Sequence, residues 1–535
     1  MSGRRPLIAI ILLASVLHGV GIARSILPAQ DGLKFIKAAR AFQVRPWWDV
    51  VRATDQHPLY PALVALAEPV LALAVGHGPD TWRLTAQMVA AAASIALLLP
   101  LHGLTTTFFN KRIADMATLG FVLLPLPMII GHDTLSDSLA LLAFVLTFRL
   151  GLCAFNSLRW ETAVGCGLVA GVGFLARPEV LVAPLAVVLT GLWKGSVSEP
   201  ENFRLRMPRL AGISIAFLVV VGSYALVKGE VSEKLAMRQA AAIGPSAAPI
   251  RKAGHWLPKG LDDAYWDFSP KEEPSEVVRR PLAEVLESLA LRWSEGLGGV
   301  LAFFAIWGFV RDGHIRKILR FGNDSERPDE RNIGRTLVVV YLVLFTLLLV
   351  RHEMRMGYLS DRHTLTLLTL SLPWAAAGVF VCAWGLANAL KWSPRVARAA
   401  GIALLVAGVA AGVFFQVKRV HTSRWGHREA GRWLTSNADK SDAVLDTRGW
   451  AAFVSGLPAY DYWHVRQAFT DARLAYVVVG EDELKAPSRR AETLRAVLAY
   501  AAKPVAGFPE KKGGHEVGVW VYRYEKPESW EGLAR

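Results

Sequence analysis

Acidic and basic residues recur in this sequence at the ends of long apolar stretches. A carboxylate in such a place can take a proton from a hydroxyl group, and an arginine can hold a phosphate through paired hydrogen bonds. The residues of this kind are Asp31, Asp55, His57, Asp133, Asp137, Arg177, Glu179, Asp361, Arg362 and His363. Because charges are costly near lipid, a set of them on one membrane face indicates a functional site. The sequence therefore predicts a cleft of acids and bases at the membrane surface.

Each of these residues also has an ordinary structural explanation. Asp31 opens "DGLKFIKAARAF", whose spacing predicts an interfacial helix, so it is equally suited to be an N-cap. His57 precedes a helix start in "DQHPLYP", and Arg177 with Glu179 interrupts an apolar run as a tight hairpin would. Arg362 in "LSDRHTL" could simply extend its charge toward water. The argument for a site therefore depends on the positions of these residues taken together.

The elements that position these residues are apolar segments of membrane-spanning length. Hydrophobic residues make up 53% of the 535 residues and charged residues 20%, and the mean hydropathy is +0.32. We expect a polytopic α-helical membrane protein with about 11–13 transmembrane helices. The first span follows Arg4 and Arg5 and is interpreted as an uncleaved signal anchor. The predicted spans are roughly 6–22, 60–76, 86–104, 114–130, 138–155, 162–176, 180–193, 209–227, 293–310, 336–350, 363–386 and 397–417.

The net charge of +15 is explained by basic loops on the cytoplasmic side, and we expect no nucleic-acid partner. The arginine-rich stretch 311–335 is the predicted cytoplasmic anchor of the topology, which places loop 228–292 outside. Arg4 and Arg5 on the inside would place loop 23–59 outside as well. If all twelve predicted spans cross the membrane, however, counting back from this cytoplasmic loop places Arg4 and Arg5 outside, which contradicts their expected position inside. We expect the miscounted segment in 60–104, where residues 60–76 could enter without crossing.

Two regions are predicted: a transmembrane domain over 1–423 and an extracytoplasmic α/β domain over 424–535. In the second region, "DAVLDTRGWAAFVSG", "RLAYVVVG" and "GVWVYRYE" predict strands, and "SRRAETLRAVLAYAA" predicts an amphipathic helix. Nothing there forms a nucleophile or metal constellation. We interpret this domain as an acceptor-recognition element, a lid or a structural unit.

The motifs follow an order that resembles the membrane glycosyltransferases of the C-type fold that use polyprenyl-phosphate sugars, especially protein O-mannosyltransferases and lipid A aminoarabinose transferases. The resemblance covers roughly residues 1–420. The matching elements are Asp31 in the first outer loop, "HPLY" (57–60), "TWRL" (81–84), "SDSLALLAF" (136–144), "GLVAGVGFLARPEVLVAPL" (167–185) and "SDRHTLTLLTL" (360–370).

The resemblance implies a base at Asp31 and phosphate contacts at Arg177, Arg362 and His57, with Arg251 or Lys252 as further candidates. The family's usual outer-loop motif is an Asp–Glu pair, but Gly32 follows Asp31 here. A second carboxylate would then come from Asp55 or Asp137, and Glu179 completes the predicted substrate-binding set.

The resemblance implies inverting transfer of a hexosyl or pentosyl group from a polyprenyl-phosphate donor to a hydroxyl of a lipid, glycan or protein acceptor. The reaction would occur at the outer face of the cytoplasmic membrane, with the C-terminal domain on the periplasmic side. We expect no required cofactor and no metal ligands; a divalent metal is possible but not indicated. The alternatives are a transporter or flippase and a non-catalytic membrane scaffold.

Overall fold

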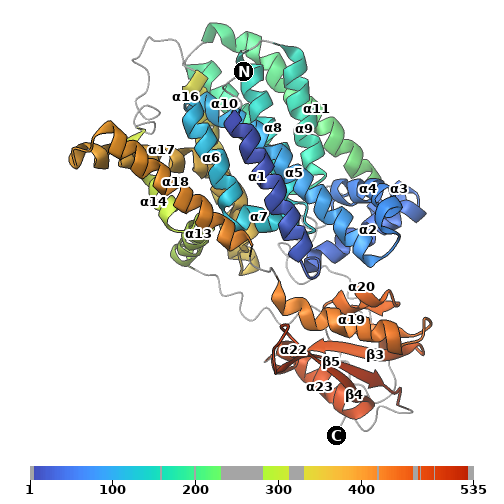
Figure 1. Ribbon diagram of the computed structural model, residues 1–535. Helices are drawn as coiled ribbons and strands as arrows, with labels where there is room; N and C mark the ends of the chain where they lie inside the picture. The colour runs from blue at the N-terminus through green and yellow to red at the C-terminus, as the bar shows by residue number, and fades with distance from the viewer. Residues whose placement is uncertain are drawn as a thin grey trace.

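The computed structural model describes residues 5–156, 159–197, 200–229, 281–312, 330–417, 421–461, 468–469, 471–486 and 489–527. These residues form a bundle of helices and, at one end of the bundle, a smaller α/β domain (Figure 1). Most of the predicted outer loop 228–292, including Arg251 and Lys252, lies outside the described residues, as does 313–329 of the predicted cytoplasmic loop.

The bundle is built from long apolar helices, as the hydropathy pattern predicts. Its helices are α1 (Arg5–Arg24), α2 (Gln30–Val44), α3 (Trp47–Ala53), α4 (Leu59–Val75), α5 (Pro79–Phe108), α6 (Lys111–Leu123), α7 (Pro125–His132), α8 (Asp137–Asn156), α9 (Trp160–Phe174), η2 (Pro178–Leu181), α10 (Val182–Val197), α11 (Pro200–Lys228), α13 (Leu282–Gly296), α14 (Val300–Arg311), α16 (Glu330–Met356), η3 (Asp361–Thr364), α17 (Leu365–Ala389) and α18 (Pro394–Gln416).

Small residues allow the helices to approach closely. A side chain at Gly308 of α14 would collide with the backbone of α17 at Trp374, and one at Gly378 of α17 would collide with the backbone of α14 at Phe304. Close backbone contact through glycine is typical of helix pairs in membranes, where packing rather than hydrophobic burial holds helices together. The same pattern recurs where Gly167 of α9 meets α11.

The segment predicted to span at 60–76 is α4, a short apolar helix that packs against α2 and α5 beside α3 (Figure 1). Its first residue, Leu59, donates a backbone hydrogen bond to Leu175, two residues before Arg177. Just beyond its last residue, α5 begins, and Trp82 of α5 lies under Arg40, whose guanidinium also covers Phe453 of the α/β domain. These contacts favour the prediction that this segment enters the membrane without crossing it.

The sequence-based topology becomes consistent if α4 is left out of the count. Within the described residues, seven helices are long and apolar enough to cross, two bent helix pairs can each form one crossing, and two short apolar helices besides α4 remain. The first two groups give up to nine crossings, and counting the two short helices as well would give eleven, within the expected range of about 11–13. An odd number of crossings would place the two chain ends on opposite faces, as expected from basic Arg4 and Arg5 inside and the α/β domain outside.

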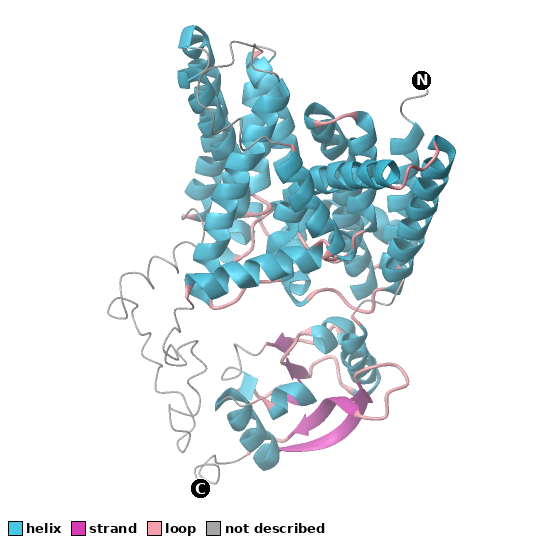
Figure 2. Cartoon of the chain, turned by 90° about the vertical axis from the view of Figure 1, so that its left-hand side faces the viewer, coloured by secondary structure: helices cyan, strands magenta, loops and turns pink. Residues whose placement is uncertain are grey.

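The C-terminal domain is a mixed five-stranded sheet with helices, drawn in Figure 2 below the bundle. The strand order is β2-β1-β3-β5-β4, with β1 parallel to β2 and β3, and β5 antiparallel to β3 and β4. Its elements are η4 (Thr422–Arg424), α19 (Trp425–Asn437), β1 (Ala443–Asp446), α20 (Trp450–Ser455), β2 (Ala459–Tyr460), β3 (Leu474–Gly480), α22 (Glu481–Lys485), α23 (Arg489–Ala501), β4 (Ala502–Pro509) and β5 (Val517–Tyr524).

The predicted strands and helix of this domain are found with one difference. The stretch "DAVLDTRGWAAFVSG" contains β1 and then helix α20. Asp446, at the end of β1, accepts backbone hydrogen bonds from Arg448 and from Ala452 in the first turn of α20, and so satisfies amides of the turn and of the helix start. The predicted strands at 473–480 and 518–525 are β3 and β5, and the predicted helix is α23.

A polar junction ties the domain to the bundle. Asp133, which follows α7, accepts a hydrogen bond from the backbone amide of Ala29 at 2.9 Å and pairs with His421 at 3.0 Å. Burial alone would raise the pKa of Asp133, but the hydrogen bond with His421 and the charge of Arg424 hold it below its usual value. Trp450 donates to the carbonyl of Pro28 at 2.9 Å. The domain is therefore held over the same end of the bundle as α2.

Candidate active site

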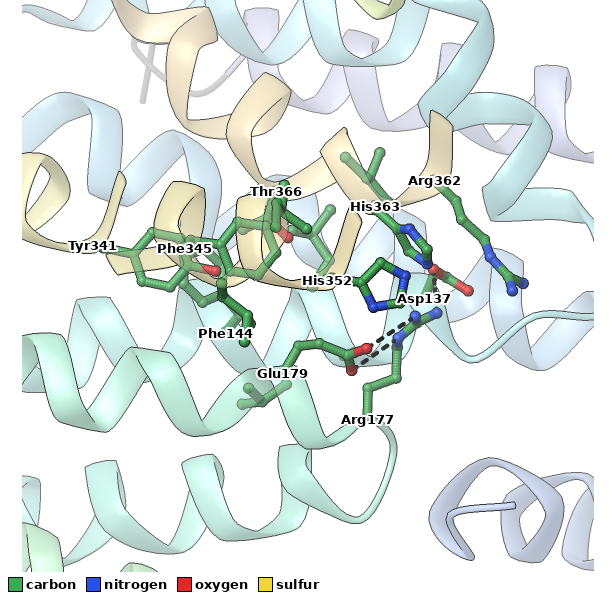
Figure 3. Close-up of a pocket in the computed structure, with 16 residues that line it drawn as sticks. Asp137, Phe144, Arg177, Glu179, Tyr341, Phe345, His352, Arg362, His363 and Thr366 are labelled. Atoms are coloured by element: carbon green, nitrogen blue, oxygen red, sulfur yellow. Dashed lines mark hydrogen bonds and ion pairs between the residues drawn. The ribbon is translucent and has the colours of Figure 1, made fainter. Parts of the chain in front are cut away.

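A pocket of about 90 Å³ lies where four elements of the bundle meet. Its walls come from the start of α8, the turn between α9 and η2, the outer part of α16, and η3 with the first turn of α17 (Figure 3). The chain breaks at each of these places for a local reason. Helix α9 ends at Phe174, and Pro178, which favours extended backbone at the preceding Arg177, is the first residue of η2. A capping box between Ser360 and His363 starts η3.

Arg177 forms the centre of the polar half of the pocket. Its guanidinium donates to Asp137 at 2.5 Å and makes two longer contacts of 3.4 Å with Glu179. The side chain of Asp137 is only 6% exposed, so this carboxylate depends on Arg177 for its charge partner. Burial alone would lower the pKa of Arg177, but the two carboxylates raise it above its usual value, so the guanidinium stays charged.

Arg362 links the pocket to the first outer loop. It lines the pocket from η3, and its guanidinium lies 2.7 Å from the carboxylate of Asp31 at the start of α2. Both side chains are partly exposed, 29% for Arg362 and 44% for Asp31. The predicted base and one of the predicted phosphate-binding arginines thus form an ion pair, although they lie far apart in the sequence.

Two histidines complete the polar half. His352 of α16 and His363 of η3 stack edge to face with ring centroids 4.9 Å apart, and both line the pocket. The Nδ1 atom of His363 accepts a hydrogen bond from the backbone amide of Ser360 at 3.3 Å. In that arrangement Nε2 carries the proton, and His363 is a neutral donor.

The other half of the pocket is aromatic and aliphatic. Tyr341 packs against Phe144 with ring centroids 4.5 Å apart and stacks on Phe345 at 5.3 Å. Leu348 and Leu349 extend this wall along α16. Figure 3 shows these rings on one side and the charged groups on the other. The pocket therefore offers a charged end and an apolar end to one ligand.

The structure brings five of the predicted site residues together and leaves two apart. Asp137, Arg177, Glu179 and Arg362 line the pocket, and Asp31 joins it through Arg362. Asp55 instead lies 3.7 Å from Lys34 near the surface. His57 is buried, with its ring 5.4 Å from Phe174 and 5.7 Å from Tyr224. Neither residue lines the pocket.

Sequence reasoning missed His352 and the aromatic wall. The polar stretch after the apolar run of α16, "RHEMRMGYLSDRH", contains His352 and did signal a segment at the outer end of the bundle. The aromatic residues carried no such signal, because they belong to an ordinary apolar span. Within the described residues, no group of three or more histidines, cysteines or carboxylates is arranged to hold a metal ion.

The helical bundle, with its charged pocket at the end of the helices near the C-terminal domain, belongs to a polytopic membrane protein with the C-type glycosyltransferase fold. The sequence model of the Alg9-like mannosyltransferase family matches residues 57–226. That range contains Asp137, Arg177 and Glu179 but neither Asp31 nor Arg362. The resemblance indicated by the motifs is thereby confirmed.

Solved structures share this fold over nearly the whole chain. ArnT from Cupriavidus metallidurans, bound to undecaprenyl phosphate, matches with a TM-score of 0.59 at 12% identity, covering 99% of each chain. An oligosaccharyltransferase from Archaeoglobus fulgidus, in a complex with Zn and sulfate, matches with a TM-score of 0.56 at 13% identity, covering 97% of this chain and 73% of that one.

The archaeal oligosaccharyltransferase AglB from Archaeoglobus fulgidus, in complex with an inhibitory peptide and a dolichol-phosphate, gives a TM-score of 0.53 at 12% identity. That match covers 98% of this chain and 77% of that one. No protein with a curated description matches this sequence. Together the family match and the shared fold support a membrane glycosyltransferase.

Proposed function

We propose that this protein transfers a hexosyl or pentosyl group from a polyprenyl-phosphate donor to an acceptor hydroxyl, with inversion, at the outer face of the cytoplasmic membrane. The observation that carries the proposal is the ion pair between Asp31 and Arg362 beside Arg177 in a pocket with an apolar wall. The structural relatives with undecaprenyl phosphate or dolichol-phosphate bound support a donor of this class.

The two halves of the pocket match the two halves of such a donor. The polyprenyl chain would lie along the wall of Phe144, Tyr341 and Phe345, and the phosphate would reach Arg177 and Arg362. Arginine suits this contact because its planar fork binds two phosphate oxygens at once. His363 would add a neutral donor to a third oxygen.

Donor binding would have to rearrange the ion pairs. A pocket of about 90 Å³ has room for only a few water molecules, and both arginines are already paired with carboxylates. The pair between Asp31 and Arg362 is the more exposed one and is the easier to open. We propose that the phosphate replaces Asp31 at Arg362, and that the released carboxylate then faces the acceptor.

In the reaction, the acceptor oxygen forms a bond to the anomeric carbon while the bond from that carbon to the phosphate oxygen breaks. The acceptor proton passes to Asp31, and the polyprenyl phosphate leaves with the electron pair and the added negative charge. Arg177 and Arg362 would stabilise that charge as it develops. Attack opposite the leaving phosphate inverts the anomeric centre, as in inverting glycosidases. Phosphate is already a competent leaving group, and we propose that no metal cofactor is required.

The test is transfer of radiolabelled sugar from a panel of polyprenyl-phosphate sugars to an extractable acceptor or to water, in reconstituted membranes. We expect transfer by the wild-type protein, with and without a metal chelator, and a loss of about 100-fold or more in Asp31→Asn. Asp49→Asn, which removes an exposed carboxylate of α3, is the matched control and should transfer normally. Equal transfer by the two variants would contradict Asp31 as the base. Inert wild-type protein on every donor, with vectorial uptake in liposomes, would instead favour a transporter.

A further inference from the structure

A second cavity, of about 380 Å³, lies between the last turn of α1 and the C-terminal domain. Arg24 and Ser25 line it from the bundle, Trp425 and Arg428 line it from α19, and Lys512 lines it from the turn between β4 and β5. It shares no lining residue with the candidate active site. It is therefore a separate space, formed where the two parts of the molecule meet.

This cavity is strongly basic. Three cationic side chains line it and no carboxylate does. The carboxylates nearest to Arg428 already have partners, because Asp80 pairs with Arg83 at 3.2 Å and Glu429 pairs with Arg432 at 3.1 Å. Within the part of the chain that the structure describes, Arg428 and Lys512 make no salt bridge. Their charges are left for an external anion.

An aromatic ring orients two of these cations. The guanidinium of Arg428 lies 5.8 Å from the centroid of the Trp425 ring, and the ammonium of Lys512 lies 5.5 Å from it. A tryptophan ring holds cations through its negative face and is enriched where protein leaves the membrane. Trp425 therefore holds both cationic groups beside the same cavity.

The cavity also lies at the depth of lipid headgroups. Helix α1 has 20 residues from Arg5 to Arg24 and is an apolar candidate span. At 1.5 Å per residue, a helix of this length covers roughly the 30 Å hydrocarbon core. Its last residue, Arg24, thus lies where the acyl chains end and the phosphates begin.

We propose that this cavity binds the phosphate of an anionic lipid headgroup from the leaflet that faces the C-terminal domain. Arg24 and Arg428 contact the phosphate oxygens, and Lys512 adds a third positive charge. Trp425 packs at the boundary between headgroup and acyl chain. A lipid bound here bridges α1 and α19. The inference does not depend on sugar transfer, because the active-site pocket and this cavity have different residues.

The test measures lipid binding to the purified full-length protein in detergent by native mass spectrometry. The probes are phosphatidylglycerol, phosphatidylcholine and inorganic phosphate. The variant Arg428→Gln with Lys512→Gln removes two cavity charges. Lys440→Gln with Lys511→Gln removes two exposed charges of the same domain that do not line the cavity.

We expect phosphatidylglycerol to bind in preference to phosphatidylcholine, and roughly a fivefold loss of affinity for each cavity charge removed. The Lys440 and Lys511 variant should bind like the wild type. If the double cavity variant does not fold, Lys512→Gln alone, in an exposed turn, should still show the fivefold loss. Equal affinity in cavity and control variants, or no preference between the two lipids, would overturn the proposal. Displacement of the lipid by inorganic phosphate at equal concentration would overturn the lipid as the ligand.

Discussion

The ion pairs of the pocket join residues that the sequence predicts as site residues one at a time, without predicting which of them pair. A charged residue at the end of an apolar segment reveals its membrane face, which is why Asp31, Arg177 and Arg362 could be predicted together. The sequence does not reveal the direction in which each helix turns its side chains. Asp55 and Asp137 both lie at the start of apolar segments, but their side chains have different partners. Asp55 lies beside Lys34, whereas Asp137 lies beside Arg177 in the pocket. The direction of the side chains also brings in His352, which no motif marked.

The pair between Asp31 and Arg362 leads to a prediction about affinity. Asp31 competes with the donor phosphate for Arg362, so Asp31→Asn should tighten the binding of polyprenyl phosphate. The expected change in affinity is about fivefold, because a partly exposed ion pair contributes about 1 kcal/mol. Arg362→Gln should weaken binding by at least about tenfold, because a charged hydrogen bond to the phosphate is lost. Titration by microscale thermophoresis measures both effects. Weaker binding by Asp31→Asn would show that the carboxylate does not compete.

The pair between Arg177 and Asp137 leads to a prediction about stability. Arg177→Gln leaves the buried carboxylate of Asp137 without its cation and should lower the free energy of unfolding by about 3–5 kcal/mol. Adding Asp137→Asn removes the unpaired buried charge. The double variant should therefore recover much of the lost free energy of unfolding, but it should not recover sugar transfer. Thermal unfolding in detergent, followed by tryptophan fluorescence, measures the stability. An additive effect of the two substitutions would exclude this pairing.

Most elements of the bundle follow from the length and hydropathy of their segments. Hydropathy does not say whether a short apolar helix crosses or returns. For α4, the hydrogen bond from Leu59 to Leu175 and the contact of Arg40 with Trp82 of α5 and with Phe453 of the α/β domain favour a return. In the C-terminal domain, the strand β1 could be predicted, but the helix α20 that follows could not. Its start depends on the buried carboxylate of Asp446 and a glycine with positive φ, Gly449.

Asp446 should make the C-terminal domain more stable at mildly acidic pH. Burial raises the pKa of this carboxyl to about 6. The hydrogen bonds that it accepts from backbone amides act in the opposite direction and lower the pKa. A carboxyl with a raised folded-state pKa contributes stability that is fully present below its unfolded-state pKa and is lost as the pH rises through about 6. Between pH 5 and pH 8 the expected loss is about 1 kcal/mol.

The measurement is hydrogen exchange of residues 443–455, corrected for the intrinsic pH dependence of exchange. Protection should fall from pH 5 to pH 8 in the wild-type protein. Asp446→Asn has no proton to release at this position and should show a flatter profile. The same fall in both proteins would assign the pH dependence to another group.

At the scale of the whole molecule, the C-terminal domain covers the end of the bundle that contains the pocket. His421, Arg424 and Trp450 make this docking through contacts with the chain around Leu27, Pro28 and Asp133. These contacts join residues roughly 290–420 positions apart. No local pattern in the sequence predicts them, whereas the change of composition after residue 417 did predict a separate α/β region.

The arrangement predicts which loops share a face. In a background without Cys153, Cys166 and Cys382, cysteines placed at Asp49, His77 and Lys503 should react with an impermeant reagent from one side of the membrane. A cysteine at Asn110, between α5 and α6, should react from the other side. Sealed vesicles of opposite orientation distinguish the two outcomes. Labelling of positions 49 and 77 from opposite sides would mean that α4 crosses the membrane.

The most direct test of the account is an experimental structure of the protein with a polyprenyl phosphate bound. We predict that the phosphate lies within hydrogen-bond distance of Arg177 and Arg362, that the lipid chain follows Tyr341 and Phe345, and that Asp31 has separated from Arg362. A phosphate bound away from both arginines, or an intact pair between Asp31 and Arg362 in the complex, would contradict the proposed site.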